Sequence, residues 1–340
     1  MKRKWIRRVS WILLTPVLLF VILMILLYIP PVQNLLRREV TAYASKATGM
    51  QIQVERIDLR FPLNLLVRGV EVIQQPDTLL SLESLNVRVQ AWPLVKGKVE
   101  VDEVTLSQVA FNSANLIEGM KIKGVLGRFF LQSHGVDLSN ELAVINQTEL
   151  SDTHVQMLMN DTTTTPKDTT ASAPVNWKVD LHKLKLKNVS FSMQLPADSM
   201  RMAAHIGEAF INDAQADLKN QFYELKQFLL SGSSANYDTG AAKPGEGFDA
   251  SHIAVRDIRI GLDSLLYKGR DMNAVIREFS MNERSGLSIT SLTGRAFSND
   301  SIIRIPGIKL QTPHSYQCSS RRNNLSSRRF NTIYDSRNQS

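Results

Sequence analysis

The residues that could carry out chemistry are few in this chain of 340 residues, and they are scattered along it. Its six histidines form no H-x-x-H or H-E-x-x-H pair, the spacings typical of zinc ligands, so solvated strand positions are favoured for them. Neither a G-x-S-x-G nucleophile elbow nor a G-x-x-x-x-G-K-[ST] or G-x-G-x-x-G phosphate-binding loop occurs. The only cysteine, Cys318, lies near the C-terminus, which excludes a disulfide framework and Cys-ligated metal sites. We therefore expect no catalytic residue, no cofactor, no metal site and no enzymatic activity.

The net charge of +8 belongs to the two ends of the chain. Residues 1–10 carry five basic side chains, and residues 313–340 carry five arginines and one aspartate, which leaves a net charge of −1 on the remainder. Because the body is neutral, we expect no nucleic-acid partner. The run His182–Lys187 alternates lysine with leucine, a pattern typical of a solvated strand face.

One segment is long and apolar enough to cross a membrane. Residues 11–29 form 19 positions without a charge, which reach about 28 Å as a helix. Trp11 and Tyr28 flank the segment, where amphipathic rings favour the membrane interface. A cleaved signal peptide is the alternative, but the apolar run exceeds the usual ~7–15 residues and no small-x-small cleavage site follows it. We predict an uncleaved signal anchor within residues 1–30, with the N-terminus in the cytoplasm because the basic residues precede the span.

The periodicity of apolar residues changes after the predicted anchor. Two prolines followed by near-helical apolar spacing, with Gly49 as a stop, predict an amphipathic helix over residues 31–49. From Met50 onward apolar and polar residues alternate, which predicts strands from about 51 to 159 and from 175 to 312. Only residues 200–230 are ambiguous, and 213–230 are compatible with a short helix.

Composition divides the strand-rich region. Residues 160–174 are rich in Thr and Pro and contain no large apolar residue, which indicates a solvated loop or linker. Residues 231–247, rich in Gly, Ser and Ala, indicate a second exposed loop. The predicted organisation is therefore an anchor (1–30), an amphipathic helix (31–49), a first β block (50–159), a linker (160–174), a second β block (175–312) and a disordered basic tail (313–340). For the tail, a basic arm is one interpretation; the favoured hypothesis is a shifted or truncated reading frame.

An internal similarity predicts how the strands bend. The pattern Val101-x-x-Val104-x-Leu106-x-x-Val109-x-Phe111 recurs at every apolar position in residues 181–191, and partial copies begin at Val54 and Val255. A step of three residues within a two-residue alternation moves the apolar side chains to the other face unless the strand contains a bulge or corner. Its recurrence favours a sheet that curls repeatedly across its strands, whereas a chance match between alternating segments is the alternative.

Several features, in order, resemble the N-terminal region of AsmA-like proteins of the TamB (translocation and assembly module) branch. They are the basic N-terminus, the single anchor, the helix from Pro31-Val32-Gln33 to Lys46-Ala47-Thr48-Gly49, and the strands that follow it as far as Leu106. The similarity is clearest over residues 1–112. It implies a mostly β fold with an N-terminal transmembrane α-helix and a short amphipathic helix, and a curled antiparallel, groove-like sheet of the β-taco type.

The same resemblance implies a function. Such proteins are anchored in the inner (plasma) membrane, face the periplasm, and aid lipid transfer between inner and outer membranes or outer-membrane protein assembly and secretion. The implied partners are the inner-membrane bilayer, phospholipid as cargo, and an outer-membrane assembly partner through a C-terminal region that this chain, expected to be a truncated member, lacks. The alternative from the residues alone is a membrane-anchored scaffold with a closed β core and no lipid cargo. Six residues are the candidates for lining a lipid groove: Val101, Val104, Leu106, Leu181, Leu184 and Leu186.

Overall fold

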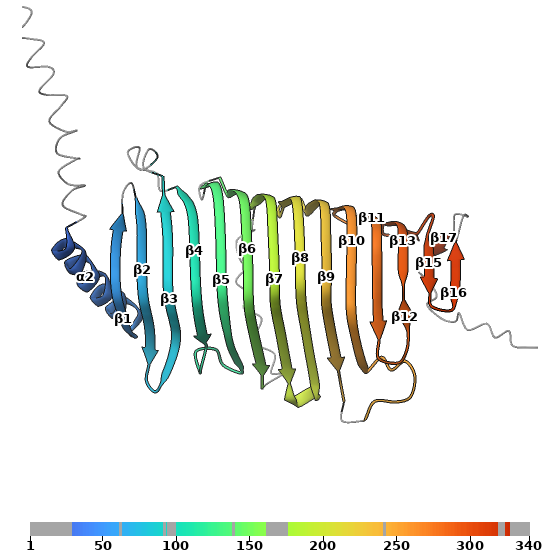
Figure 1. Ribbon diagram of the computed structural model, residues 1–340, viewed down its shortest axis with the longest axis horizontal. Helices are drawn as coiled ribbons and strands as arrows, with labels where there is room; N and C mark the ends of the chain where they lie inside the picture. The colour runs from blue at the N-terminus through green and yellow to red at the C-terminus, as the bar shows by residue number, and fades with distance from the viewer. Residues whose placement is uncertain are drawn as a thin grey trace, which may run out of the picture.

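The computed structural model describes residues 29–60, 63–90, 93, 100–137, 140–160, 176–240, 243–318 and 324–326. Figure 1 shows the strands side by side in one long sheet, with helix α2 at its N-terminal end. In chain order the elements are α2 (Pro30–Thr48), β1 (Gln51–Arg60), β2 (Asn64–Gln74), β3 (Asp77–Val89), β4 (Val101–Asn112), β5 (Met120–Asp137), β6 (Leu142–Met159), β7 (Lys178–Leu195), the 3-10 turn η1 (Pro196–Asp198), β8 (Met200–Asp217), β9 (Phe222–Asp238), β10 (His252–Lys268), β11 (Asp271–Glu283), β12 (Ser288–Ile289), β13 (Ser291–Ser298), β14 (Ile302–Arg304), β15 (Lys309–Thr312), β16 (Ser315–Cys318) and β17 (Asn324–Ser326).

The sheet is a meander in which each strand from β1 to β11 pairs with the next strand along the chain. The short strands that follow extend it through the pairing of β13 with β11. All pairs are antiparallel except β6 with β7, which run parallel from Leu142 opposite Lys178 to Leu158 opposite Gln194. The mostly β prediction is confirmed, but the sheet is mixed and not antiparallel throughout because of this one pair.

The length of the β6–β7 connection accounts for the exception. Parallel neighbours require a connection that leads back along the whole strand, whereas a tight turn gives an antiparallel pair. Eighteen residues, 160–177, separate the two strands. At about 3.3 Å per residue they can span roughly 60 Å, which is enough for a strand as long as β6. Strands from both predicted β blocks therefore belong to one hydrogen-bonded sheet.

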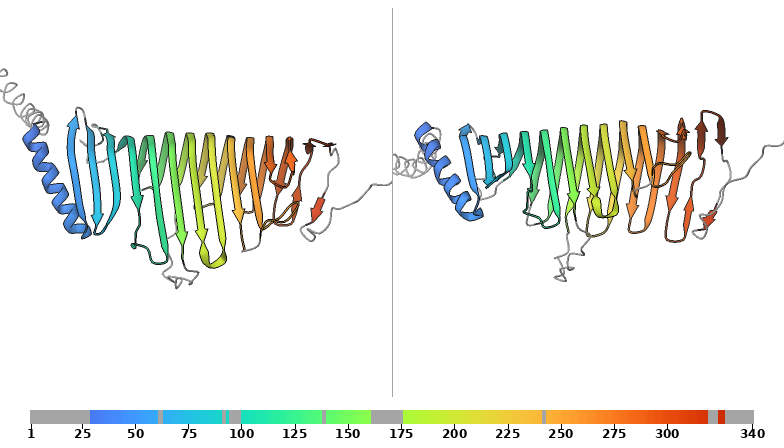
Figure 2. Two further views of the ribbon diagram at one scale, coloured as in Figure 1. Left: turned by 60° about the horizontal axis from the view of Figure 1, so that its bottom comes forward. Right: turned by 90° about the horizontal axis from the view of Figure 1, so that it is seen from below.

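The sheet is curved and does not close on itself, as two further views show (Figure 2). Its first bend follows a row of residues left out of the cross-strand pairing, which we call the first corner line. On β3 and β4, for example, Leu82 pairs with Val109 and Ser84 with Ser107, so that Glu83 and Gln108 face each other unpaired. The first corner line consists of Glu55, Gly69, Glu83, Gln108, Gly127, Asp152, Asn188, Gly207, Gly232 and Asp257.

Backbone conformation at this line explains the bend. Positive φ angles occur at Gly69, Gln108, Asp152, Asn188, Gly232 and Asp257. Glycine, asparagine and aspartate visit this left-handed region at lower cost than other residues, and one such residue turns a strand without ending it. The three-residue steps from Leu106 to Val109 and from Leu186 to Val189 cross the line, so the predicted bend is confirmed.

A second row of bends, the second corner line, runs through His182, Asp213, Lys226 and Asp263. Leu181 pairs with Ala214 and Lys183 with Asn212, which leaves His182 and Asp213 unpaired. Asp213 has a φ of 49°. The three-residue step from Leu181 to Leu184 crosses this line, so both steps of the repeated pattern correspond to a bend in the sheet.

Two local expectations are wrong in the region after residue 200. Residues 213–230 contain no helix: β8 continues to Asp217, and β9 begins at Phe222. The expected loop at 231–247 is strand as far as Asp238, and the connection to β10 covers only 239–251. The small residues there serve the first corner line, because Gly207 and Gly232 lie too close together for larger side chains.

Helix α2 closes the N-terminal edge of the sheet. It begins at two prolines and ends at Gly49, whose φ is 71° and whose N–H donates to the Ser45 carbonyl oxygen at 2.9 Å, as the sequence predicts. Arg37 donates from Nη1 to the carbonyl oxygens of Val54 and Glu55 at 3.2 and 3.1 Å. These bonds, with one from Gln33 to Leu59 and one from the Ile52 N–H to Ser45 Oγ, satisfy backbone groups that an edge strand would otherwise expose.

The predicted anchor, with Trp11 and Tyr28, lies outside the described residues. Among the residues that the structure does describe, no helix is both long and apolar enough to cross a membrane. Within the predicted tail, Ser315–Cys318 and Asn324–Ser326 form short strands, where the sequence predicted disorder. Residues 319–323 and 327–340 are outside the description.

Candidate functional site on the apolar face of the sheet

The six residues predicted to line a groove lie on one face of the sheet, in three cross-strand rows. Leu106 and Leu186 share a row in which every residue is apolar over eleven strands. That row consists of Ile57, Val67, Leu85, Leu106, Phe129, Leu150, Leu186, Ala209, Leu230, Ile260 and Phe279. Because side chains opposite each other in a sheet point to the same face, the register brings these residues into one continuous apolar band.

The other predicted residues lie in the two adjacent rows. Val104 and Leu184 share a row that is apolar except at Thr148. Leu181 follows in a row with Ile145 and Ala214. Val101 pairs with Val89, which lies two residues after Val87 of the Val104 row and therefore on the same face. The structure therefore gathers all six residues on one face, although strands β5 and β6 separate the two triplets.

The same face continues beyond the first corner line. The step from Leu106 to Val109 spans three residues, and the strand bends between them. Because of this bend, the row of Val109 points to the same side of the sheet as the row of Leu106. This row consists of Val54, Val70, Leu82, Val109, Leu126, Thr153, Val189 and Ile206. The result is an apolar surface on both sides of a bend.

Most of this surface is neither buried nor fully exposed. Among the described residues, the buried apolar side chains are only Ile57, Leu79, Leu82, Ala143, Ala209 and Ala274, each 6–7% exposed. The residues predicted to line a groove are all half-buried. A face-to-face β-sandwich would bury such a band. The apolar face is therefore only partly shielded from solvent.

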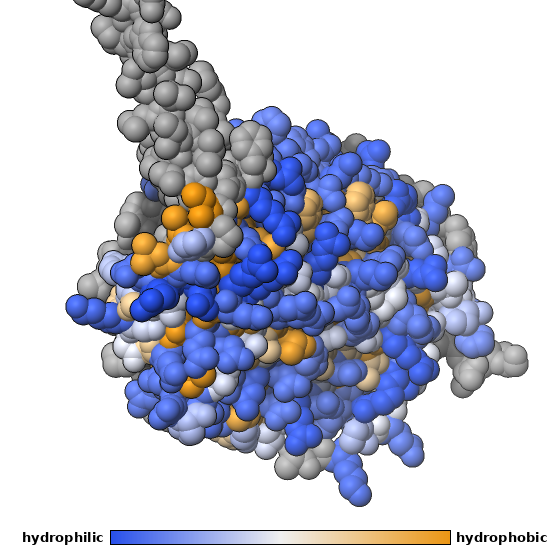
Figure 3. Space-filling view, turned by 60° about the vertical axis from the view of Figure 1, so that its left-hand side comes forward, coloured by the Kyte–Doolittle hydropathy of each residue, from blue (hydrophilic) through white to orange (hydrophobic). Residues whose placement is uncertain are grey.

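The opposite face, which we call the polar face, is polar on β7 but also carries Phe130, Phe210 and Leu229. On β7 the exposed lysines Lys183, Lys185 and Lys187 alternate with half-buried leucines. The space-filling view from the α2 side shows a largely hydrophilic surface, with apolar side chains gathered next to the helix (Figure 3). On α2 itself Leu35 and Tyr43 are 58% and 77% exposed. Apolar and polar residues therefore separate onto the two faces of β7, and less completely on the neighbouring strands.

Polar side chains buried at the apolar face are satisfied by the backbone. Ser133 is 2% exposed and donates to the Val101 carbonyl. Thr153 and Ser233 donate to the carbonyl oxygens of Ser151 and Ser231, at 3.2 and 3.1 Å. These hydroxyls consequently present no unpaired group to an apolar ligand, whose binding such a group would weaken.

The histidines lie at separate places in the described parts of the sheet. His182 Nδ1 lies 3.2 Å from Asp213 Oδ1, and both side chains are about half exposed. The histidines at 134, 154, 205 and 252 contact Asn146, Gln156, Ser190 and Asp249, respectively, at separate places. Within the described parts of the chain, no three His, Cys, Asp or Glu side chains gather in a metal-binding arrangement.

One carboxylate is strongly perturbed, and its role is local. The backbone N–H groups of Gly245 and Ser251, with the side chain of His252, lower the pKa of Asp249 from 3.8 to about 2. Hydrogen bonds to the charged form favour it. His252 is buried beside Asp249, with Nδ1 2.9 Å from Oδ2. These contacts hold together the 239–251 connection and do not resemble a proton-transfer site.

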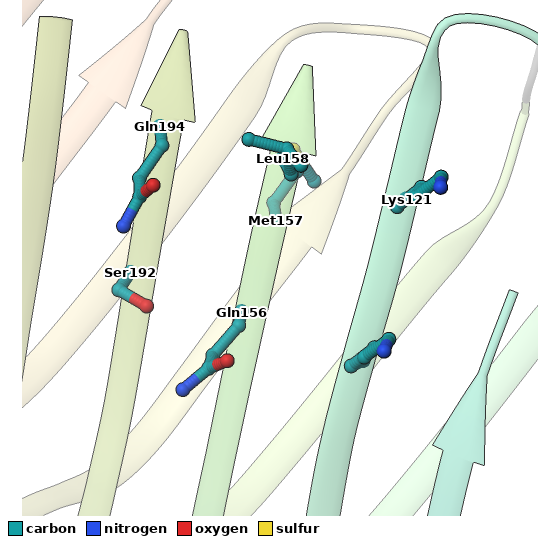
Figure 4. Close-up of a pocket in the computed structure, with 7 residues that line it drawn as sticks. Lys121, Gln156, Met157, Leu158, Ser192 and Gln194 are labelled. Carbon is teal, nitrogen blue, oxygen red and sulfur yellow. The ribbon is translucent and has the colours of Figure 1, made fainter. Parts of the chain in front are cut away.

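Two features near one rim of the sheet went unrecognised in the sequence. Six methionines, Met120, Met157, Met159, Met193, Met200 and Met202, lie on the apolar face of β5–β8; we call them the methionine cluster. On the polar face of β5–β7 lies a cavity of about 430 Å³, lined by Lys121, Lys123, Gln156, Met157, Leu158, Ser192 and Gln194; we call it the lysine cavity (Figure 4). Neither group is contiguous in sequence, so only the strand register reveals it.

Comparison of the sequence with protein-family models and with curated proteins gives no match.

Proposed function

We propose that this chain binds phospholipid acyl chains on the apolar face of its curved sheet and aids the transfer of lipid between membranes. The observation that carries the proposal is the uninterrupted apolar row from Ile57 to Phe279, which includes Leu106 and Leu186 and remains mostly half-buried. Covering ten methylenes on such a surface would contribute roughly 8 kcal/mol before ordering costs. An apolar band that continues across eleven strands suits a long, flexible apolar ligand.

The proposal includes the location of the chain in the cell. The uncharged segment at residues 11–29 and the resemblance to the TamB branch support an inner-membrane anchor with the β sheet in the periplasm. In that position the apolar face would shield acyl chains from water between the inner and outer membranes, or assist outer-membrane protein assembly and secretion. We favour lipid as the direct ligand because the face presents apolar side chains whose neighbouring hydroxyls are already bonded.

A scaffold with a closed β core, the alternative from the sequence, is not favoured. The sheet does not close, and most of its apolar face stays half-buried. Such a scaffold would bind protein partners only and would retain no lipid along its strands.

The direct test is mass spectrometry of phospholipid that co-purifies with the full chain in mild detergent. The test variant is Leu184→Asp/Leu186→Asp, and the matched control is Lys183→Asp/Lys185→Asp, which introduces the same carboxylates on the opposite face of β7. Any lipid held around residues 11–29 is the same in both variants. The difference between them in co-purified phospholipid therefore measures the lipid bound to the sheet. We expect about ten-fold less sheet-bound lipid in the test variant, because a buried carboxylate opposes an apolar ligand. Equal lipid content in the two variants would refute acyl-chain binding on this face.

A further inference from the structure

The methionine cluster occupies a short stretch of one long rim of the sheet. Met120 pairs with Met159 across β5 and β6, and Met157, Met193 and Met202 form a row across β6, β7 and β8. Leu195 opposite Met200 completes the array. Two-residue spacing from Thr153 and Val189, which lie in the row beyond the first corner line, places the cluster on the same face as the residues predicted to line a groove.

Methionine differs from the rest of this face in its flexibility. The row through Leu106 uses Ile, Val, Leu, Phe and Ala, whereas the cluster holds six of the chain's 11 methionines. An unbranched thioether adapts its shape to different apolar partners, and methionine-rich surfaces bind varied ligands. Met202 is 38% exposed. The rim of β5–β8 is therefore the part of the apolar face best suited to a ligand that enters in many conformations.

Directly behind the methionine cluster lies the lysine cavity. Its side chains project from three neighbouring strands, with Lys121 on β5, Gln156 on β6 and Gln194 on β7 (Figure 4). Lys123 also belongs to β5. Ser192 adds a hydroxyl donor, while Gln156 already contacts His154, with Nε2 of each side chain 2.8 Å apart. Two ammonium groups with amide and hydroxyl donors form a set that suits a phosphate or phosphodiester group.

The charged side chains that line this cavity are both basic. Among the described residues no acidic side chain lines it, and neither Lys121 nor Lys123 forms an ion pair or a hydrogen bond there. Their cross-strand partners on β6 are Leu158 and Gln156. Other lysines of the same face are different, since Lys185 lies opposite Glu149 and Lys187 opposite Glu208. The lysine cavity therefore offers two uncompensated cations.

We propose that the rim of β5–β8 is a portal where one phospholipid loads onto the sheet. The phosphodiester binds Lys121 and Lys123 on the polar face, and the acyl chains pass over the strand ends onto the methionine cluster. The strand ends make this path short, because Lys121 directly follows Met120, the first residue of β5. The inference rests on the proposed function and adds to it the entry point and the headgroup contact.

The experiment uses the full chain in mild detergent with a phosphatidylglycerol analogue that carries a photoactivatable group in its acyl chain. Peptides labelled after irradiation are identified by mass spectrometry. We expect strong early labelling of residues 157–159 and 193–202, followed by slower labelling of strands on either side. The Lys121→Gln/Lys123→Gln variant should reduce early labelling roughly 10- to 30-fold, as expected for the loss of two cations near an anionic ligand.

The matched control is Lys185→Gln/Lys187→Gln on the same face of β7, which should leave labelling unchanged. Because all four lysines are exposed, the variants should fold, which an unchanged unfolding midpoint would establish. Inorganic phosphate serves as a separate competitor. Portal loading predicts that phosphate, which lacks acyl chains, does not displace the lipid analogue at equal concentration. Displacement at that concentration would identify a free-phosphate site and overturn the proposal.

The remaining outcomes separate the portal from the proposed function. Uniform labelling along the apolar face that is insensitive to Lys121 and Lys123 would overturn the portal and leave acyl-chain binding intact. If no strand of the sheet is labelled, both the portal and acyl-chain binding on this face are overturned.

Discussion

Gly207 and Gly232 approach each other at the first corner line so closely that a Cβ at position 207 would lie 2.5 Å from the Gly232 carbonyl oxygen. The obstacle is backbone, which cannot rotate away as a side chain could. Glycine at 207 is thus what allows β8 and β9 to bend together while their apolar rows stay in register on both sides of the corner.

We expect Gly207→Ala to destabilise the fold by about 1–3 kcal/mol, the usual cost of overpacking. Gly245→Ala is the control, because its Cβ would meet only Asp249 Oδ2, at 3.9 Å; reduced freedom of the unfolded chain makes this change neutral or slightly stabilising. Denaturant unfolding of both variants measures the difference. Equal free energies of unfolding would contradict the close approach.

Asn188 tests the role of the left-handed backbone at the same line. Its φ is 53°, and its Nδ2 donates to Asp152 Oδ1 at 2.8 Å. Asn188→Val should cost about 1–3 kcal/mol, because a β-branched residue is strained at positive φ. Asn188→Gly should cost less, since glycine accepts the conformation and only the exposed hydrogen bond is lost. If valine and glycine had the same free energy of unfolding, backbone strain could not be the cause.

The contacts between α2 and β1 predict what happens when the sheet edge is uncovered. Arg37→Ala removes two hydrogen bonds to the β1 backbone and should lower the free energy of unfolding by about 1–3 kcal/mol. It should also promote self-association through the freed edge. Arg38→Ala is the control, since Arg38 is exposed on the same helix. Light scattering across a concentration series would reveal association, and identical behaviour of the two variants would argue against an edge-capping role.

Asp249 predicts a pH dependence at the 239–251 connection. Its pKa is about 2 in the folded chain, against an ordinary value of 3.8, so the folded state favours the carboxylate. The resulting stabilisation is complete above about pH 4 and is lost as the pH falls through 2. The free energy of unfolding of the native chain should therefore approach that of Asp249→Asn as the pH is lowered from 5 to 2. Parallel stability curves over this range would contradict the prediction.

Local sequence was sufficient to predict those features of the fold that depend on residues close together in the chain. The prolines at 30 and 31 and Gly49 set the bounds of α2, because these residues have restricted or special backbone preferences. Alternation of lysine and leucine in residues 183–187 gave one polar and one apolar face to β7. The three-residue steps indicated the corners, because only a bend keeps such a pattern on one face.

Residues that are neighbours in the chain do not predict which distant strands pair, or in which direction. The long connection at residues 160–177 permits a parallel pair but does not by itself require one, so the sequence alone does not fix the direction of β7 relative to β6. The Gly-Ser-Ala composition after residue 230 is typical of a loop. Only the structure shows that Gly232 is needed within a strand, because its backbone closely approaches Gly207. The methionine cluster draws on four strands and appears only when their register is known.

The sequence by itself determined that the chain forms long, bent, two-faced strands, since alternation and backbone preference act within a few residues. The tertiary structure alone decided that these strands form one open curved layer whose apolar band stays half-buried. The physical reason is that an alternating strand only requires partners on its two edges. Whether its apolar face is covered depends on how many strands join, in which register, and whether the sheet closes.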